Sequence, residues 1–185
     1  NERTFRVTSY NGDAREYTYK VVKSEIESDG DVELKTTEEV ASFAATKTTV
    51  VKGNLIIGSD AEEAEKITDI SALASLKEVT GNIVIRNSYN GADLTGLDNI
   101  VSAGGLQVGS TDVASKATEL HMISMKALET LSGDISVYND QVTYVLFEKL
   151  ATIGGSVMFN ASSLQSFEFP VLTTVGQDLN LQGLN

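Results

Sequence analysis

Histidine and cysteine, which often serve as nucleophiles, bases or metal ligands, are nearly absent from this sequence. It has one histidine, His121, and no cysteine. A hydrolytic triad would need a nucleophile near His121, yet no Gly-x-Ser-x-Gly segment or comparable signature occurs. One histidine without other ligands at metal-binding spacing is typical of a polar surface. We therefore predict no catalytic residue, no metal site and no cofactor.

Two pairs of aspartates have spacings that could serve catalysis or calcium binding. Asp134 and Asp178 lie 22 residues on either side of Ser156. A 22-residue repeat would place them on one outward row, about 10 Å apart, within reach of an inverting glycosidase pair. Solubilising edge residues are the favoured interpretation. Asp29 and Asp31 resemble the start of a calcium loop, but the remaining ligands are missing, which favours a polar turn.

Composition narrows the classes of partner. The chain has 185 residues, of which 41% are apolar and 22% charged, as in a globular protein. A formal net charge of −12 argues against nucleic acid as a partner, because binding phosphates requires clustered Lys and Arg. No apolar run is long enough to cross a membrane, so we predict no direct membrane insertion.

The elements that would position any site come from an internal repeat. Apolar residues recur with a displacement of 22 residues in three consecutive sets: Leu120, Ile123, Met125, Leu128, Leu131, Ile135 and Val137; Val142, Val145, Phe147, Leu150, Ile153, Val157 and Phe159; and Leu164, Phe167, Phe169, Leu172, Val175, Leu179 and Leu181. Such a repeat indicates a solenoid, in which stacked turns bury a continuous core. We expect Leu150, Val157 and Phe167 to be buried.

Earlier turns carry the same strand at wider spacing. The first inward residue of each strand is predicted to be Leu55, Ile83, Leu106, Ile135, Val157 and Leu179. A glycine before each strand would allow a positive φ at the corner and close stacking. Each turn is predicted to hold two short strands, for example 164–169 and 178–182, joined by a Leu-x-x-[Val/Ile/Leu] corner. Residues 59–66, 87–93 and 110–119 are expected to form corner loops.

The N-terminal part shows two further elements. Alternating apolar residues on either side of Asn11-Gly12-Asp13 predict a β-hairpin within residues 4–22. Thr36 and Glu39 have the spacing of a capping box, which predicts a short helix over 37–45 that covers the first turn. We therefore divide the chain into an N-terminal hairpin region, 1–34, and a solenoid, 35–185.

The segments TTEEVASFAATKTTVVKGNLIIG, LKEVTGNIVI and LATIGGSVMF resemble the receptor L-domain family. The resemblance covers about residues 35–185 and implies a mainly β, right-handed parallel β-helix or leucine-rich solenoid of about six turns, in a bacterial surface-protein version without cystines. It also implies an extracellular setting and a binding role, but no particular ligand. Residues 1–23 resemble the end of a bacterial immunoglobulin-like module, which would make this the C-terminal part of a longer protein.

The outward face of the strands is the expected binding surface. Its central column should hold Ile56, Val84, Gln107, Ser136, Met158 and Asn180, flanked by Arg86, Tyr138, Asn160 and Gln182. Apolar residues beside Arg and Tyr are typical of a protein interface. We predict that the binding residues are Ile56, Val84, Arg86, Tyr138, Met158 and Asn160. Covering of this face by long side chains or loops is the alternative.

Three functions remain open at this point. The favoured one is a non-enzymatic extracellular or cell-surface recognition and adhesion module for an unknown protein or glycan, lipid-anchored in the parent protein as one option. The alternatives are a carbohydrate-active β-helix enzyme and a structural spacer. The last turn would expose Phe167, Phe169, Leu179 and Leu181, so we expect this edge to be covered, by an end-to-end homodimer or by further parent sequence.

Overall fold

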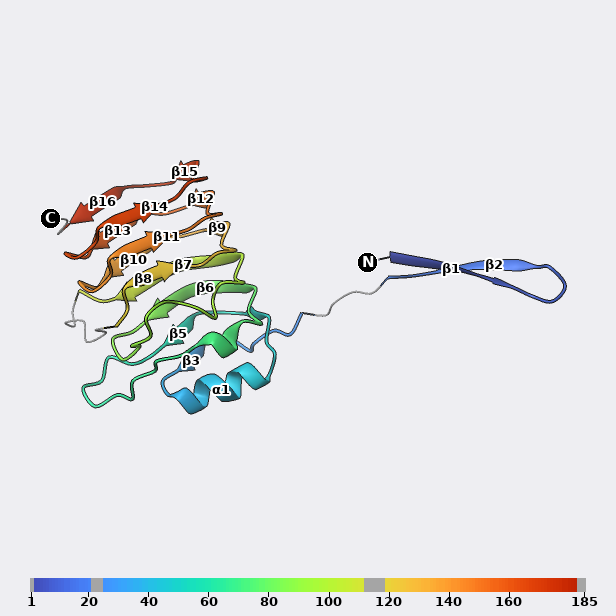
Figure 1. Cartoon of the computed structure of the whole chain (residues 1–185), viewed down its shortest axis with the longest axis horizontal. Coiled ribbons are helices and arrows are strands. Elements are labelled where there is room, and N and C mark those ends of the chain that lie inside the picture. Colours follow the sequence, from blue (N-terminus) through green and yellow to red (C-terminus); the bar gives the residue numbers. More distant parts are fainter. Residues whose placement is uncertain (1, 21–24, 112–118, 183–185) are drawn as a thin grey trace.

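The computed structural model describes residues 2–20, 25–111 and 119–182, which form an antiparallel hairpin and a parallel β-solenoid of about six turns (Figure 1). The predicted fold class is confirmed. The turns stack one above the next, with an α-helix at the first turn and strand β16 at the last (Figure 1).

The largest sheet carries one strand from each turn along its main face. These strands are β3 (Val32–Leu34), β5 (Leu55–Ile57), β6 (Glu78–Ile85), β7 (Ser102–Gly109), β10 (Ile135–Tyr138), β13 (Val157–Asn160) and β16 (Leu179–Gln182). Their parallel register aligns the predicted inward residues in one row, Leu55, Ile83, Leu106, Ile135, Val157 and Leu179. The predicted register is therefore confirmed at every turn.

Each of the last three turns contains three strands, so the prediction of two strands was wrong. The additional strands are β9 (Thr130–Leu131), β12 (Thr152–Ile153) and β15 (Thr174–Val175), which extend the large sheet, as β4 (Val50–Val51) does earlier. A separate sheet holds β8 (Met122–Ser124), β11 (Tyr144–Leu146) and β14 (Ser166–Glu168). The predicted Leu-x-x-Ile corner ends in an extended segment. Its first residue, Leu150, lies just before β12, and its last residue, Ile153, ends that strand; both side chains are buried.

The core runs through the solenoid but thins at its last turn. Every apolar residue of the first two 22-residue sets is at most 1% exposed, whereas in the third set only Leu164 is buried. Phe167, predicted to be buried, is half-buried because no turn among the described residues lies beyond it. Leu150 and Val157 are buried as predicted. The ring of Phe169 stacks on that of Phe147 at 5.6 Å between centroids, so the last turn still adds aromatic contacts.

The glycines before the strands serve close stacking and not a positive φ. Positive φ angles occur among described glycines at 12, 30, 58, 96 and 109, so the predicted strained corner at Gly53, Gly81 and Gly104 is wrong. A Cβ on Gly81 would lie 2.7 Å from the Gly53 carbonyl oxygen, and one on Gly104 would lie 2.6 Å from that of Gly81. Any side chain in this column would push neighbouring turns apart.

Helix α1 (Thr37–Ala45) covers the first turn, as predicted. Both hydrogen bonds of the capping box between Thr36 and Glu39 are present, and Val40 and Ala44 are buried against the core. The helix thus satisfies its own N-terminal backbone groups while its apolar face shields one end of the solenoid.

The hairpin pairs β1 (Glu2–Thr8) with β2 (Ala14–Lys20), and every one of its residues is exposed. Residues 25–34 belong structurally to the solenoid, because β3 pairs with β5 and the Ser28 amide donates to the Val50 carbonyl. This strand falls in the segment that the sequence placed with the hairpin. The division into two domains and the immunoglobulin-like origin of the hairpin stay predictions.

The predicted corner loops contain neither helix nor strand at 59–66 and 87–93, apart from a bridge between Ile67 and Tyr89. A 3₁₀ turn, η1 (Ser71–Leu73), follows within the same wide turn. Of the predicted loop at 110–119, residues 112–118 lie outside the described residues. Loop 87–93 is anchored by Tyr89, whose buried hydroxyl donates to the Asp93 carbonyl and whose pKa is raised by that burial.

Two equivalent phenylalanines test the depth of the core. Phe147→Ala should cost about 3–5 kcal/mol in free energy of unfolding, because the ring is fully buried and its removal leaves a cavity. Phe169→Ala, one repeat later and half-buried, should cost clearly less. Urea unfolding followed by circular dichroism measures both. Equal losses in free energy of unfolding would contradict the conclusion that the core thins at the last turn.

Candidate functional site

The predicted binding residues lie together on the outward face of the large sheet. Parallel register aligns Ile56 with Val84, Val84 with Gln107, Gln107 with Ser136, Ser136 with Met158, and Met158 with Asn180, which reproduces the predicted central column. The same register places Arg86, Tyr138 and Asn160 in the next outward column. The predicted site residues therefore share one face, and their role in binding stays a prediction.

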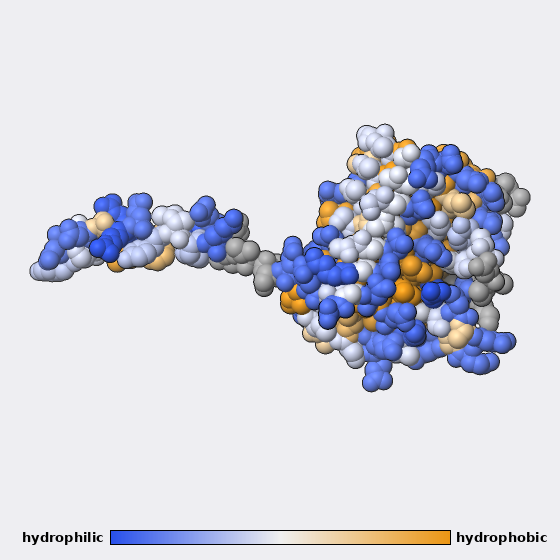
Figure 2. Space-filling view, turned by 180° about the vertical axis from the view of Figure 1, so that it is seen from behind, coloured by the Kyte–Doolittle hydropathy of each residue, from blue (hydrophilic) through white to orange (hydrophobic). Residues whose placement is uncertain are grey.

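This face, which we call the sheet face, is partly open to solvent. The side chains of Ile56, Val84 and Met158 are half-buried, as are Arg86 and Tyr138, whereas Asn160 is exposed. The Tyr138 hydroxyl contacts the Met158 sulfur at 2.9 Å, which fixes two members of the face against each other. Apolar groups also emerge between polar ones on the side of the solenoid seen in Figure 2. The sheet face thus combines apolar area with a few oriented polar groups.

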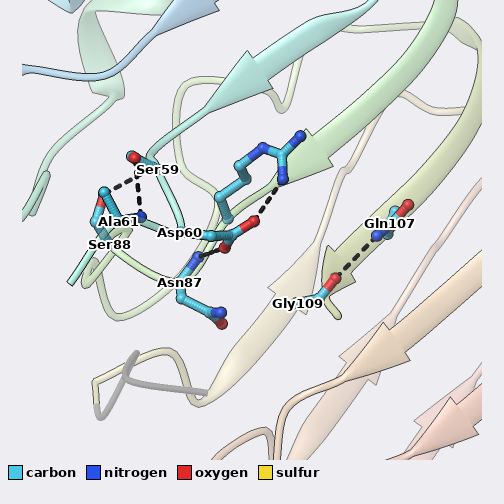
Figure 3. Close-up of polar contacts among 8 residues, drawn as sticks. Ser59, Asp60, Ala61, Asn87, Ser88, Gln107 and Gly109 are labelled. Carbon is cyan, nitrogen blue, oxygen red and sulfur yellow. Dashed lines mark hydrogen bonds and ion pairs between the residues drawn. The ribbon is translucent and has the colours of Figure 1, made fainter. Parts of the chain in front are cut away.

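Arg86 is held at the edge of the sheet face by a polar cluster that sequence reasoning missed (Figure 3). Its guanidinium pairs with the carboxylate of Asp60, which also accepts the backbone N–H of Asn87 at 3.1 Å. The Ser88 hydroxyl accepts the Ser59 amide at 2.9 Å. Because Asp60 compensates its charge, Arg86 presents a positioned cation but adds no net positive charge to the face.

Beside this cluster, the side chain of Asn87 is 4% exposed, and neither of its amide atoms has a hydrogen-bond partner in the described structure. A cavity of about 50 Å³ adjoins it, lined by Ser59, Ala61, Glu62, Ala64, Lys66, Asn87 and Ser88. The cavity is large enough for water-sized groups. It is too small for an organic ligand, so we assign it no binding role.

A ladder of short polar side chains runs along the other edge of the sheet face. Asp31 accepts the Asn54 amide at 2.7 Å, and Asn54 accepts the Asn82 amide at 2.8 Å. Further along, Asp134 accepts the Ser156 amide at 2.7 Å and the Ser156 hydroxyl accepts the Asp178 amide at 3.3 Å. The predicted outward row of Asp134, Ser156 and Asp178 is thus present.

The ladder could have been found in the sequence. Each strand-opening glycine or its equivalent is followed by Asn, Asp or Ser at the same repeat position, except at Gly105, and these are the short residues whose side chains hydrogen-bond to backbone. Asp31 likewise acts as a turn and ladder residue, and its pKa is lowered by the Asn54 amide that it accepts.

The single histidine lies away from the sheet face. His121 is exposed, and its Nδ1 lies 3.1 Å from the Gln141 carbonyl oxygen, which is a surface hydrogen bond. Over residues 2–20, 25–111 and 119–182, no three His, Cys, Asp or Glu side chains gather as a metal site would require. In the same ranges, no helix has the length and apolar character needed to cross a membrane.

A second hollow lies on another side of the solenoid. It measures about 390 Å³ and is lined by Glu25, Thr49, Val50, Lys77, Glu78, Val101 and Ser102. Its charged groups are of both signs, and Val101 is 39% exposed. None of the predicted binding residues lines it.

These observations define a class, a parallel β-solenoid that presents an ordered, partly apolar sheet face. Within it, the model of the receptor L domain family matches residues 47–114, which confirms the resemblance drawn from the sequence. Receptor L domains are a ligand-binding, non-catalytic type of domain and are typically extracellular. No curated protein matches the chain. The bacterial origin of the chain stays a prediction.

Asp140 bonds to the following turn of the solenoid and makes the stability of the fold depend on pH. Asp140 accepts both the backbone amide of Ser162, at 2.9 Å, and its hydroxyl, at 2.8 Å. These bonds, the backbone one foremost, lower the pKa of Asp140 from its ordinary value of 3.8. Because the folded pKa lies below the unfolded one, the stabilisation is present above the unfolded pKa and is lost as pH falls through the folded pKa.

Asp140→Asn should therefore reduce stability at neutral pH and flatten the acid limb of the stability profile. Ser162→Ala keeps the backbone donor and should have a smaller effect of the same sign. Urea unfolding at about pH 7 and about pH 3 measures both. Parallel profiles for Asp140→Asn and the unmodified protein would contradict this role.

Proposed function

We propose that this protein is a non-enzymatic recognition module that acts outside the cell or at its surface and binds its ligand through the sheet face. The observation that carries the proposal is the alignment of Ile56, Val84 and Met158 in one outward column, with Arg86 and Tyr138 beside them. The family match at residues 47–114 supports a binding role for the turns that carry Ile56, Val84 and Arg86.

The construction of the face favours binding over catalysis. Its side chains stand on in-register strands, so a ligand would meet a preorganised surface and order few groups on binding. Half-buried apolar residues can be desolvated at low cost, and an aromatic and an arginine are the residue types that most often anchor an interface. Asp134 and Asp178, the carboxylates considered for catalysis, lie on the ladder that links the turns.

A lysine scan across two faces tests this proposal. Val84→Lys and Met158→Lys place a charge on the sheet face, and each should weaken binding of a ligand found on a protein and glycan array by about tenfold or more. Leu146→Lys is the matched control, because Leu146 is also apolar, half-buried and outward, but on β11. Its affinity should stay within about twofold of the unmodified protein.

Calorimetric titration with the array hit gives the affinities. A loss of binding in Leu146→Lys with unchanged affinity in both sheet-face variants would overturn the assignment of the face. Turnover of any array hit would overturn the non-enzymatic role.

We also propose that the exposed edge of the last turn binds a second copy of the chain. Leu179 is 58% exposed, Leu181 37% and Val171 47%, and among the described residues β16 pairs only with β13. Helix α1 covers the opposite end of the solenoid, so the open end of one copy would meet the open end of another. Such contacts are two-fold symmetric and closed, which favours a dimer over a filament.

Self-association should then depend on this edge. Sedimentation velocity should show a concentration-dependent dimer, and Leu179→Lys should convert it to monomer. Val101→Lys, which also alters an exposed valine but on another side of the solenoid, should leave the dimer intact. A monomer at every concentration would contradict the proposal and favour a covering segment from the parent protein.

A further inference from the structure

A hollow interrupts the sheet face at β7. It measures about 300 Å³ and is lined by Asn82, Gly105, Leu106, Gln107, Gly133, Asp134 and Ser136. Its floor is Gly105, which stands in the ladder position between Asn82 and Asp134 and has no side chain. A Cβ there would lie 2.8 Å from the Asn82 side-chain oxygen and 2.9 Å from the Asp134 carbonyl oxygen, so the site accepts only glycine.

The neighbouring Gln107 leaves the hollow open. Its side-chain amide donates to the Gly109 carbonyl at 3.0 Å, so it leans along the strand toward Gly109 (Figure 3). The Asn82 side-chain oxygen lies close to Gly105, whereas the Asp134 carboxylate points toward the following turn, where it accepts the Ser156 amide. Both are exposed, while Ser136 is half-buried.

The side chains around the hollow are mostly polar and of mixed type. Asn82 and Gln107 each offer donors and an acceptor, Ser136 offers a hydroxyl, and Asp134 offers acceptors only. The Asp134 carboxylate is oriented by the Ser156 amide at 2.7 Å. The Asn82 backbone is likewise fixed by Asn54 at 2.8 Å. A ligand would therefore meet several hydrogen-bonding groups within one small concave area.

Three features of the hollow restrict the class of ligand that it could bind. An added peptide strand is excluded, because β7 is paired on both sides, with β6 and with β9 and β10. A phosphate or acidic sugar is disfavoured by Asp134 and by the net charge of −12. An apolar ligand would bury the amides and the carboxylate without hydrogen-bond partners, which costs free energy. A small neutral molecule with many hydroxyl groups can both donate and accept hydrogen bonds, so it would satisfy the amides, the hydroxyl and the carboxylate together.

We infer that the hollow at Gly105 is a subsite for a neutral saccharide, with Asn82, Asp134 and Ser136 as its hydrogen-bonding residues. The volume of about 300 Å³ lies at the lower end of the range for small-ligand sites. The inference rests on the proposed function, since it names one ligand class for part of the sheet face. Tyr138 follows Ser136 by two residues on this face, about 7 Å along the strand, where a neighbouring ring could contact it.

Matched pairs of variants test the subsite with an array of neutral and acidic oligosaccharides as probes. The unmodified protein should bind neutral oligosaccharides in preference to acidic ones. Ser136→Tyr should fill the hollow and weaken that binding by about tenfold or more. Asn180→Tyr, in the same outward column two turns away, should leave the affinity within about twofold.

A second pair separates charge from shape. Asp134→Asn keeps an oxygen that can accept the Ser156 amide but loses the carboxylate, so affinity for the neutral sugar should fall and discrimination against acidic sugars should weaken. Asp178→Asn, on the same row, should change neither. Unfolding curves confirm that all four variants are folded.

Each outcome decides the matter. Absence of binding to every neutral oligosaccharide at millimolar concentration would overturn the subsite, as would unchanged affinity in Ser136→Tyr. If no saccharide binds, but a protein from the protein and glycan array does and Val84→Lys abolishes that binding, the sheet face remains the binding surface and only the saccharide assignment fails. If lysine on the sheet face alters no binding at all, the proposed function itself fails.

Discussion

Successive turns of this solenoid lie close enough for the backbone of one turn to hydrogen bond directly to the next. The Gly81 amide donates to the Gly53 carbonyl at 2.8 Å, and the Gly155 amide donates to the Gly133 carbonyl at 3.0 Å. From Gly53 to Gly155 this position is always glycine, and backbone atoms of the neighbouring turn approach each of these glycines closely; only the last turn has a side chain there, at Gln177. Because register is fixed by this contact, an inward residue of one turn always lies over the inward residue of the previous one.

The same constraint orders the outer surface. Once the inward row is aligned, every second residue points outward in an equally aligned column, whatever its chemistry. The polar ladder adds side-chain bonds between turns, as from Asp134 to the Ser156 amide, and so stiffens the face at its edge. A surface of this kind is preorganised, which reduces the entropy lost when a ligand binds.

The sequence predicted the elements with regular spacing well. The inward row from Leu55 to Leu179 and the capping box at Thr36 follow from periodicity and local hydrogen bonding, and both are present. The outward column followed from the same periodicity. Such features depend only on neighbours in the chain or on a strand pattern that recurs along it, so a single sequence is enough to reveal them.

Features that depend on contacts between irregular segments were missed. The pairing of Arg86 with Asp60 joins two corner loops, and no repeat relates them. The third strand of each turn was missed because two extended residues, such as Thr152 and Ile153, are too short to show alternation. The prediction of a positive φ at the strand-opening glycines was wrong. A glycine that is needed to avoid a collision with the neighbouring turn cannot be told in sequence from one that is needed for a positive φ.

Irregularity in the repeat coincides with the polar chemistry of the surface. The last turns keep a constant spacing of 22 residues, whereas the first inward residues from Leu55 to Ile135 are spaced by 28, 23 and 29. The Arg86 cluster, the buried Asn87 amide and the hollow at Gly105 all lie in these irregular turns. A regular turn is already sufficient to bury the core, so the added residues and the unfilled ladder position at Gly105 are not required for folding. Departures from the simplest pattern that persist without a gain in core packing are where function is expected, which favours the irregular turns as the part that distinguishes this solenoid from a spacer.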